Sequence, residues 1–246
     1  MIKSIVTFYN GKGGVGKTTS ALSFSDGLRR AGKRVLTIDL DWQGQVARSL
    51  GVEFQRDVAG PLMLPDEIDL ASRIVSSGRD GWDLIPASRK LSEARVVLEA
   101  RQDSTVVKRL VAELPVDYDV VVIDCSPAYD ILSRNAYMAA TDLVIPVKAD
   151  FMSTLGLNDA WWSLEEARAG NARLRRVAIL PTCVQDGELA DEIMRLLKVS
   201  FKQYVVDAIP TCKYVQKAFW YHKTIFELRP SARSAVAYAQ LANRWL

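Results

Sequence analysis

The chain alternates between short runs of apolar, β-branched residues and longer segments in which apolar residues recur every three or four positions. Runs of the first kind predict β-strands, and spacing of the second kind predicts amphipathic helices. The expected strands cover residues 2–8, 34–38, 82–85, 119–123, 143–147, 177–180 and 205–209. Several of these runs are apolar throughout, which is typical of strands covered by helices on both faces. The pattern predicts an α/β fold with a doubly wound, mostly parallel sheet and helices on both faces.

The helical segments between these runs have clear apolar faces. The first is expected to end at Gly32 and to carry one apolar stripe, made of Ala21, Phe24, Leu28 and Ala31. A second face is expected over residues 157–167, and a closing helix packed on the core over residues 232–245. No repeat or Pro/Gly/Ser-rich linker interrupts the alternation, so residues 1–246 are expected to form a single domain.

Composition removes several classes of protein. Of the 246 residues, 49% are hydrophobic and 25% charged, which is ordinary for a globular chain and unlike disordered or fibrous proteins. No stretch approaches the roughly 20 apolar residues of a membrane span, and the first residues lack the pattern of a signal peptide. The three cysteines follow no metal or disulfide spacing. These features predict a cytoplasmic protein.

The net charge of +3 identifies no partner, but its distribution is uneven. Residues 151–246 contain 13 Lys and Arg against nine Asp and Glu, whereas residues 1–150 contain 19 against 20. The densest basic stretch runs from Lys198 to Arg233. Its side chains could form solvated helix faces or a weak binding surface for a polyanion. By charge alone, the candidates for the second reading are Lys198, Lys202, Lys213, Lys217, Arg229 and Arg233.

The strongest chemical signal follows the first expected strand. The segment fits the pattern G-x-x-x-x-G-K-[ST] and consists of Gly11, Lys12, Gly13, Gly14, Val15, Gly16, Lys17, Thr18 and Thr19. Glycines let backbone N–H groups point at phosphate oxygens, and the following helix adds the positive end of its dipole. Lys17 can reach the β- and γ-phosphates, and the Thr18 hydroxyl can bind Mg²⁺. Lys12 is an additional lysine, which could either stay in water or meet a phosphate.

Acidic residues follow two other strands at the same expected edge of the sheet. Asp39 and Asp41 end the second strand, and Asp124 ends the run 119–123. They could organise Mg²⁺ or orient an attacking water, with Asp124 as an outer-sphere residue of the metal. Asp is also common at strand ends because its side chain bonds to the backbone of turns. The neighbouring phosphate loop favours the functional reading.

These motifs together resemble one family. The loop from Lys12 to Thr19 resembles the deviant Walker A motif of the ParA/MinD ATPases, whose mark is the additional lysine. Residues 35–44 are similar to the family's second acidic motif, although Trp42 replaces the usual proline. Residues 121–127 resemble its Walker B strand, and further matches extend over nearly the whole chain, which looks most like the short, Soj-like ParA proteins.

The resemblance implies a mechanism. Family members sandwich two ATP molecules, with Mg²⁺, between two subunits, and the residue matching Lys12 reaches the partner's phosphates. Lys17 would hold the phosphates of its own subunit, Thr18 would bind Mg²⁺, Asp41 would position water and Asp39 would support the metal. Loss of the γ-phosphate would loosen the homodimer. Adenine is expected near Pro181, Thr182, Pro210 and Thr211.

The branch of the family follows from what the chain lacks. No Lys-rich amphipathic extension follows the closing segment at Leu246, so membrane binding is not expected. Short ParA proteins bind DNA non-specifically as ATP dimers. The resemblance therefore implies a slow, nucleoid-associated ATPase that partitions DNA or positions cargo and is stimulated by a ParB-like or other cargo adaptor. The alternatives are a MinD-like membrane-associated regulator and an ATP-switched assembly factor without DNA binding.

Overall fold

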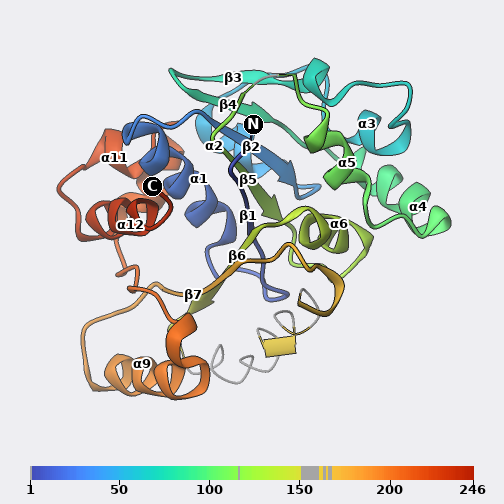
Figure 1. Ribbon diagram of the computed structural model, residues 1–246. Helices are drawn as coiled ribbons and strands as arrows, with labels where there is room; N and C mark the ends of the chain where they lie inside the picture. Colours follow the sequence, from blue (N-terminus) through green and yellow to red (C-terminus); the bar gives the residue numbers. More distant parts are fainter. Residues whose placement is uncertain (1, 116, 151–160, 163–164, 166–167) are drawn as a thin grey trace.

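The computed structural model describes residues 2–115, 117–150, 161–162, 165 and 168–246 (Figure 1). Its centre is a seven-stranded sheet in the order β3-β4-β2-β5-β1-β6-β7. All neighbouring strands are parallel except β3 and β4, which confirms the expected mostly parallel sheet. The strands are β1 (Ser4–Phe8), β2 (Val35–Leu40), β3 (Val75–Arg79), β4 (Trp82–Ile85), β5 (Val120–Cys125), β6 (Asp142–Lys148) and β7 (Arg176–Thr182).

Two details of the sheet differ from the expectation. Residues 205–209 form no strand: they run beside β7 with only an isolated bridge and a few backbone bonds, such as Val206 N–H to Ile179 O at 3.0 Å. Pro210 follows directly and has no N–H with which to continue a ladder. Conversely, β3 was not expected, because its sequence is polar and contains Gly78. As an antiparallel edge strand, β3 needs no continuous apolar run.

Helices cover both faces of the sheet, as expected (Figure 1). One hydrophobic cluster contains buried residues of α1 and α12, and the opposite cluster contains residues of α4, α5, α6 and α9. The α-helices are α1 (Lys17–Arg30), α2 (Gln45–Leu50), α3 (Ala59–Met63), α4 (Leu91–Arg101), α5 (Val106–Ala112), α6 (Ile131–Ala139), α9 (Glu188–Phe201), α10 (Lys213–Trp220), α11 (Ile225–Leu228) and α12 (Arg233–Asn243), with short 3₁₀ turns at Leu70–Arg73 and Lys202–Tyr204.

Two of the three predicted helical segments correspond to described helices. The first, α1, ends two residues before Gly32, and the closing helix is α12. The four residues that defined the face over 157–167 lie outside the described residues. In the described part of the chain, no helix combines the length and the apolarity that crossing a membrane requires.

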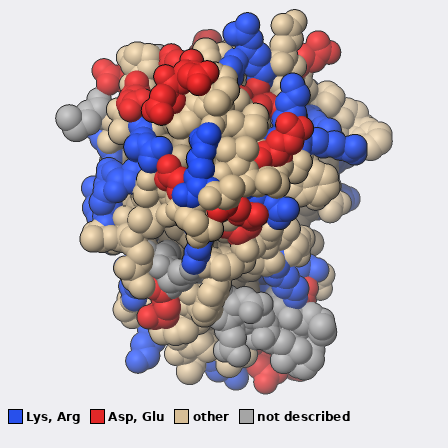
Figure 2. Space-filling view, turned by 90° about the vertical axis from the view of Figure 1, so that its right-hand side faces the viewer, with Lys and Arg blue, Asp and Glu red and all other residues tan. Residues whose placement is uncertain are grey.

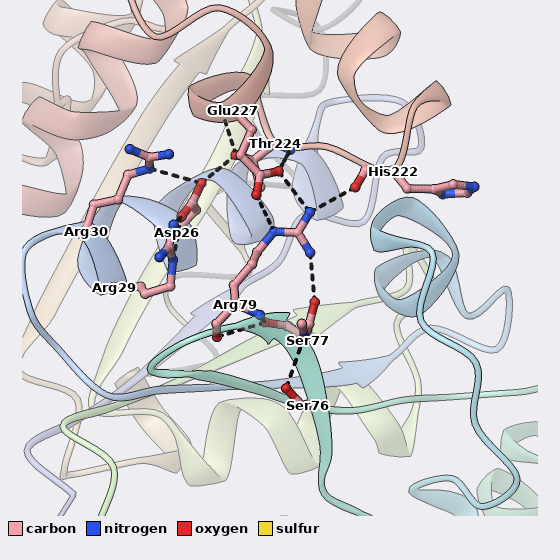
Figure 3. Close-up of polar contacts among 10 residues, drawn as sticks. Asp26, Arg29, Arg30, Ser76, Ser77, Arg79, His222, Thr224 and Glu227 are labelled. Carbon is pink, nitrogen blue, oxygen red and sulfur yellow. Dashed lines mark hydrogen bonds and ion pairs between the residues drawn. The ribbon is translucent and has the colours of Figure 1, made fainter.

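A polar network joins α1, β3 and the turn between α10 and α11 (Figure 3). The fully buried Asp26 of α1 accepts a hydrogen bond from the Thr224 hydroxyl. Arg79 of β3 donates to both carboxylate oxygens of Glu227, each at 2.8 Å, and to the carbonyl of His222 at 2.9 Å. The network therefore fixes the C-terminal helices against the hairpin at the far edge of the sheet.

Removing the guanidinium should show how much this network stabilises the fold. Arg79→Ala leaves the partly buried Glu227 carboxylate with only the Thr224 N–H as a donor and takes the Arg79 donor from the His222 carbonyl. We therefore expect a loss of about 2 kcal/mol in the free energy of unfolding. The measurement is urea unfolding followed by circular dichroism. The control is Arg89→Ala at an exposed arginine, which should stay within about 0.5 kcal/mol of the wild type. Equal losses in the two variants would contradict the role given to Arg79.

Candidate functional site

The order of the strands brings the predicted motifs to one edge of the sheet. Strand β1 lies between β5 and β6, so the chain crosses from one side of β1 to the other after β5. Ligands of doubly wound sheets bind at such a switch point, beyond the carboxyl ends of the strands. The register places Asp124 opposite both Phe8 of β1 and Asp39 of β2. The glycine-rich loop and the two acidic strand ends are therefore neighbours.

Side chains from outside the loop fix its path. The Asn10 amide donates to the carbonyl of Pro146 at 2.8 Å, and its oxygen accepts the Lys12 N–H at 2.9 Å. On the other side, the Thr182 hydroxyl donates to the carbonyl of Val15 at 2.8 Å. Sequence reasoning missed the role of Asn10, although an Asn directly before a turn is a recognisable signal. Contacts from strands β6 and β7 thus hold the loop in its curled shape.

The end of the loop is the beginning of α1. Gly16 stands at the helix N-cap with φ +88°, a left-handed conformation that favours glycine. The next side chain, Lys17, folds back over the loop and donates from Nζ to the carbonyl of Lys12 at 2.8 Å. Burial lowers the pKa of Lys17, and the nearby Asp124 carboxylate opposes this shift. The ammonium is thus held inside the curl of backbone amides, where a phosphate would contact it.

A pocket of about 270 Å³ opens at this edge. Its walls come from the loop, the start of α1, the segment after β2 and the segment after β5. The lining residues are Gly13, Gly14, Gly16, Lys17, Thr18, Thr19, Asp41, Gln43, Gln45 and Pro127. The structure therefore brings the loop together with Asp41, and it adds Gln43 and Gln45, to which the sequence had given no role.

The segment after β2 is tightly built. Asp41 accepts the Gln43 N–H at 2.9 Å, and its carbonyl accepts the Gly44 N–H. Gly44 has φ +61°, and a Cβ atom there would lie 2.5 Å from the carbonyl oxygen of Ala87. Only glycine fits this position, which sets the direction in which α2 leaves the pocket. Trp42, between Asp41 and Gln43, remains 48% exposed.

The two fully buried carboxylates have opposite surroundings. Asp39 accepts the N–H groups of Asp41 at 2.8 Å and Val46 at 3.1 Å. Burial, and then the neighbouring Asp124, nevertheless raise the pKa of Asp39 well above its ordinary value. Neither carboxylate oxygen of Asp124 has a hydrogen-bond partner in the described part of the chain. Burial raises the pKa of Asp124 to about 7, although the nearby Thr18 hydroxyl, a potential hydrogen-bond donor, opposes this shift.

This donor set fits a magnesium ion shared with phosphates. Mg²⁺ usually takes one or two carboxylates together with phosphate oxygens and waters, rather than a cage made only of protein. An unpartnered buried carboxylate beside the Thr18 hydroxyl supplies such a half-site. Among the described residues, no three His, Cys, Asp or Glu side chains gather into a complete metal cage. Asp39 uses both oxygens to hold the segment after β2 and the start of α2, so its predicted support of the metal stays a prediction.

The residues expected near adenine end β7 or follow residues 205–209. Of the expected adenine residues, Thr182 contacts the loop, while Thr211 bonds through its N–H to the carbonyl of Val184. Pro181 is the last residue but one of β7, directly before Thr182, and Pro210 pairs with Val184 in an isolated bridge. Their contact with adenine stays a prediction.

The six basic candidates do not form one patch. Lys198 and Lys202 belong to α9 and the turn after it, whose buried residues pack on one face of the sheet. The other four belong to α10–α12, whose buried residues pack on the opposite face: Lys213, Lys217, Arg229 and Arg233.

Comparison with known proteins agrees with this geometry. Residues 3–175 match the family described as AAA domain. The chain is 36% identical over 242 residues to the chromosome-partitioning ATPase Soj of Thermus thermophilus, which covers 97% of this chain and 93% of that protein. The chain belongs to the ParA/Soj family of partition and positioning ATPases. The expected family and the expected class of enzyme, an ATPase, are confirmed.

Solved structures agree with the fold. A complex of Cyanothece McdA with ATP superposes with a TM-score of 0.87 at 19% identity, covering 98% of this chain and 95% of that one. Cobyrinic acid a,c-diamide synthase of Mycobacterium smegmatis, solved with an ATP analogue and magnesium, gives a TM-score of 0.82 at 26% identity, covering 98% and 93%. Both confirm the doubly wound α/β architecture of the ParA/Soj chain.

The unpartnered carboxylate predicts a distinctive pH dependence of the ligand-free protein. Because the pKa of Asp124 is raised on folding to about 7, the folded chain keeps a proton that the unfolded chain releases near pH 4. The stability of the wild type should therefore fall relative to Asp124→Asn as the pH rises from about 4 to about 7, by on the order of a few kcal/mol, and then level off. Urea unfolding at a series of pH values measures the difference, and parallel curves for the two proteins would refute the assignment.

Proposed function

We propose that this ParA/Soj protein forms a homodimer around two ATP molecules with Mg²⁺, binds DNA non-specifically in that state, and releases it after hydrolysis. The observation that carries the proposal is the single pocket shared by the phosphate loop and Asp41, with the buried carboxylate of Asp124 beside Lys17 and Thr18. On this proposal residues 1–246 act as one ATPase domain, associated with the nucleoid. A ParB-like or other cargo adaptor would stimulate its slow turnover.

The residues of one subunit divide the work on the triphosphate. The N–H groups of the curled loop and the start of α1 would bind the phosphate oxygens, and Lys17 would hold the β- and γ-phosphates. Thr18 and Asp124 would hold Mg²⁺, which neutralises charge on the phosphates. Asp41, at the rim of the pocket, would orient the attacking water. Asp39 would keep Asp41 and α2 in place through the hydrogen bonds that it accepts from the N–H groups of Asp41 and Val46.

Lys12 supports the dimeric arrangement. Its backbone N–H is held by Asn10, and its carbonyl accepts a hydrogen bond from Lys17. On this proposal Lys17 already holds the phosphates from within the loop. A second ammonium group would be best used against the phosphates of the other subunit, where the triphosphate still carries uncompensated charge. Loss of the γ-phosphate would remove this attraction and let the subunits separate.

Basic and aromatic side chains gather around α10, which supports a DNA surface there. Lys213 Nζ and Arg229 Cζ each lie 5.4 Å from the centroid of the Tyr214 ring. Lys217 Nζ lies 5.9 Å from the centroid of the Tyr221 ring. By contrast, Arg233 is paired with Asp186 at 3.0 Å, so part of its charge is already neutralised. Phosphate contacts from such a cluster give sequence-independent, salt-sensitive affinity.

A variant that binds but does not hydrolyse ATP tests the dimer and the DNA surface. Asp41→Ala should accumulate as an ATP-bound dimer that retains DNA, because the water is no longer oriented while the phosphate contacts remain. Light scattering measures the dimer, and filter retention of a random DNA duplex at increasing salt measures binding. An Asp41→Ala protein that stays monomeric with ATP, and binds no DNA, would overturn the proposal.

The same assay separates the two basic regions. In the Asp41→Ala background, Lys213→Glu with Lys217→Glu should lower DNA affinity by on the order of 100-fold at moderate salt, since two phosphate contacts become repulsions. The matched control is Lys198→Glu with Lys202→Glu, which should change it only a few fold. Dimerisation by ATP without any DNA retention would instead favour an assembly factor, and co-sedimentation with anionic vesicles would favour a membrane regulator.

The two lysines of the loop should have separable effects. Lys17→Ala should reduce ATP affinity by on the order of 100-fold, because it removes the ammonium that contacts the phosphates. Lys12→Ala should leave ATP affinity within a few fold but reduce dimerisation and hydrolysis by on the order of 100-fold. Isothermal titration calorimetry and phosphate release measure these quantities. Equal losses of ATP affinity in the two variants would contradict the role of Lys12 across the dimer.

A further inference from the structure

A groove of about 420 Å³ lies beside the phosphate pocket. It is bordered by three segments: the turn after β2, which contains Trp42, the start of α4, and the segment from the end of β5 to α6. Its floor is apolar and buried, made by Leu91 and Leu132. Its rim is exposed and carries the indole of Trp42. The groove is therefore shaped to take an apolar side chain from another molecule.

The rim also carries positive charge that no described residue fully balances. The guanidinium of Arg89 has no ion pair or hydrogen bond with any residue that the structure describes. Arg95 makes two long ion pairs: its Nε lies 4.0 Å from Oε1 of Glu99, and its Nη1 lies 3.9 Å from Oδ2 of Asp130. Asp130 already uses its other oxygen to cap α6. The rim therefore has one unmatched positive charge and a second that is only loosely matched.

The surface around the groove has mixed charge, so the charge of the rim determines which partners are attracted. Figure 2 shows the side of the molecule that lies to the right in Figure 1, where α4 is found, and on it basic and acidic side chains are interspersed. A partner arriving there meets no broad field of one sign. Discrimination between acidic and basic partners must then come from individual side chains such as Arg89.

The groove and the phosphate pocket share their dividing walls. Asp41 and Gln43 line the phosphate pocket, and Trp42 between them lines the groove. In the same way, Pro127 lines the pocket while its neighbours Ser126 and Ala128 line the groove. A molecule in the groove would contact the reverse side of both segments that border the phosphate site.

We propose that this groove is a docking site for an acidic segment of a partner protein, which inserts one apolar side chain between Trp42 and the floor and places a carboxylate on Arg89. The charge of the rim selects the acidic partner, and the shared walls place the partner directly behind Asp41. The inference goes beyond the proposed function, since it concerns a protein partner and holds whether or not the chain binds DNA.

The test uses the full chain without nucleotide or DNA, with its tryptophans replaced by 5-fluorotryptophan. The fluorine resonance of Trp42 is assigned from its loss in Trp42→Phe. The probe is a blocked tetrapeptide of aspartate, leucine, phenylalanine and aspartate, and the control peptide has lysine in place of each aspartate. The acidic peptide should shift the Trp42 resonance in a saturable way below about 1 mM, and the basic peptide should bind at least about tenfold more weakly.

A pair of adjacent variants identifies the residue that selects the charge. Arg89→Glu should weaken the acidic peptide at least about fivefold, whereas Lys90→Glu, an equal change of charge at an exposed neighbour outside the groove, should stay within about twofold. No saturable shift, equal affinity for both peptides, or equal weakening in both variants would overturn the proposal. A Trp42 resonance that ignores the acidic peptide and moves with protein concentration would identify a second copy as the occupant, and would overturn it too.

Because nucleotide and DNA are absent, these outcomes are independent of ATP-dependent dimerisation and of DNA retention, on which the proposed function is tested.

Discussion

Two carboxylates are buried side by side where β2 and β5 end, and most of the functional architecture is arranged around them. Asp39 and Asp124 occupy paired positions of neighbouring parallel strands, and neither side chain reaches solvent. Two backbone N–H groups satisfy Asp39, and those bonds fix the start of α2. Neither oxygen of Asp124 has a hydrogen bond of ordinary geometry within the described chain, and this carboxylate lies near Lys17 and Thr18 instead. A buried acid that lacks donors is expensive to ionise, so it favours a ligand that brings positive charge.

Contacts lead outward from this pair to the C-terminal helices. Helix α2 begins at the Asp39 bond, and its Arg48 carbonyl lies 3.1 Å from Nδ1 of His222, which follows α10. The backbone of His222 is in turn held by Arg79 of β3. The position of α10 relative to the phosphate pocket is thus set by contacts of His222 with α2 and with β3. If α10 carries the proposed DNA surface, these contacts would connect it to the phosphate pocket.

The sequence revealed the parts whose chemistry demands particular residues at fixed spacing. The glycine-rich loop and the acids after the strands could be recognised because the loop needs glycine and the strands need unbroken apolar runs. The polar edge strand β3 and the stretch 205–209 could not, since their state depends on what lies beside them. Arg79 and Glu227 are separated by 148 positions, and no local pattern signals such a pair. The same holds for the groove at Trp42, which exists only after three segments have come together.

The unpartnered Asp124 also explains why the site is assembled so firmly. An acid whose pKa is raised by burial destabilises the ligand-free fold near neutral pH, so the surrounding structure must resist rearrangement that would admit water. The anchors of the loop at Asn10 and Thr182, and the obligatory Gly44 against Ala87, supply that resistance. A ligand that offsets the buried charge binds the folded chain alone and therefore stabilises it. On the proposed function, the burial of Asp124 would therefore link the stability of the folded chain to the ligand held at the phosphate loop.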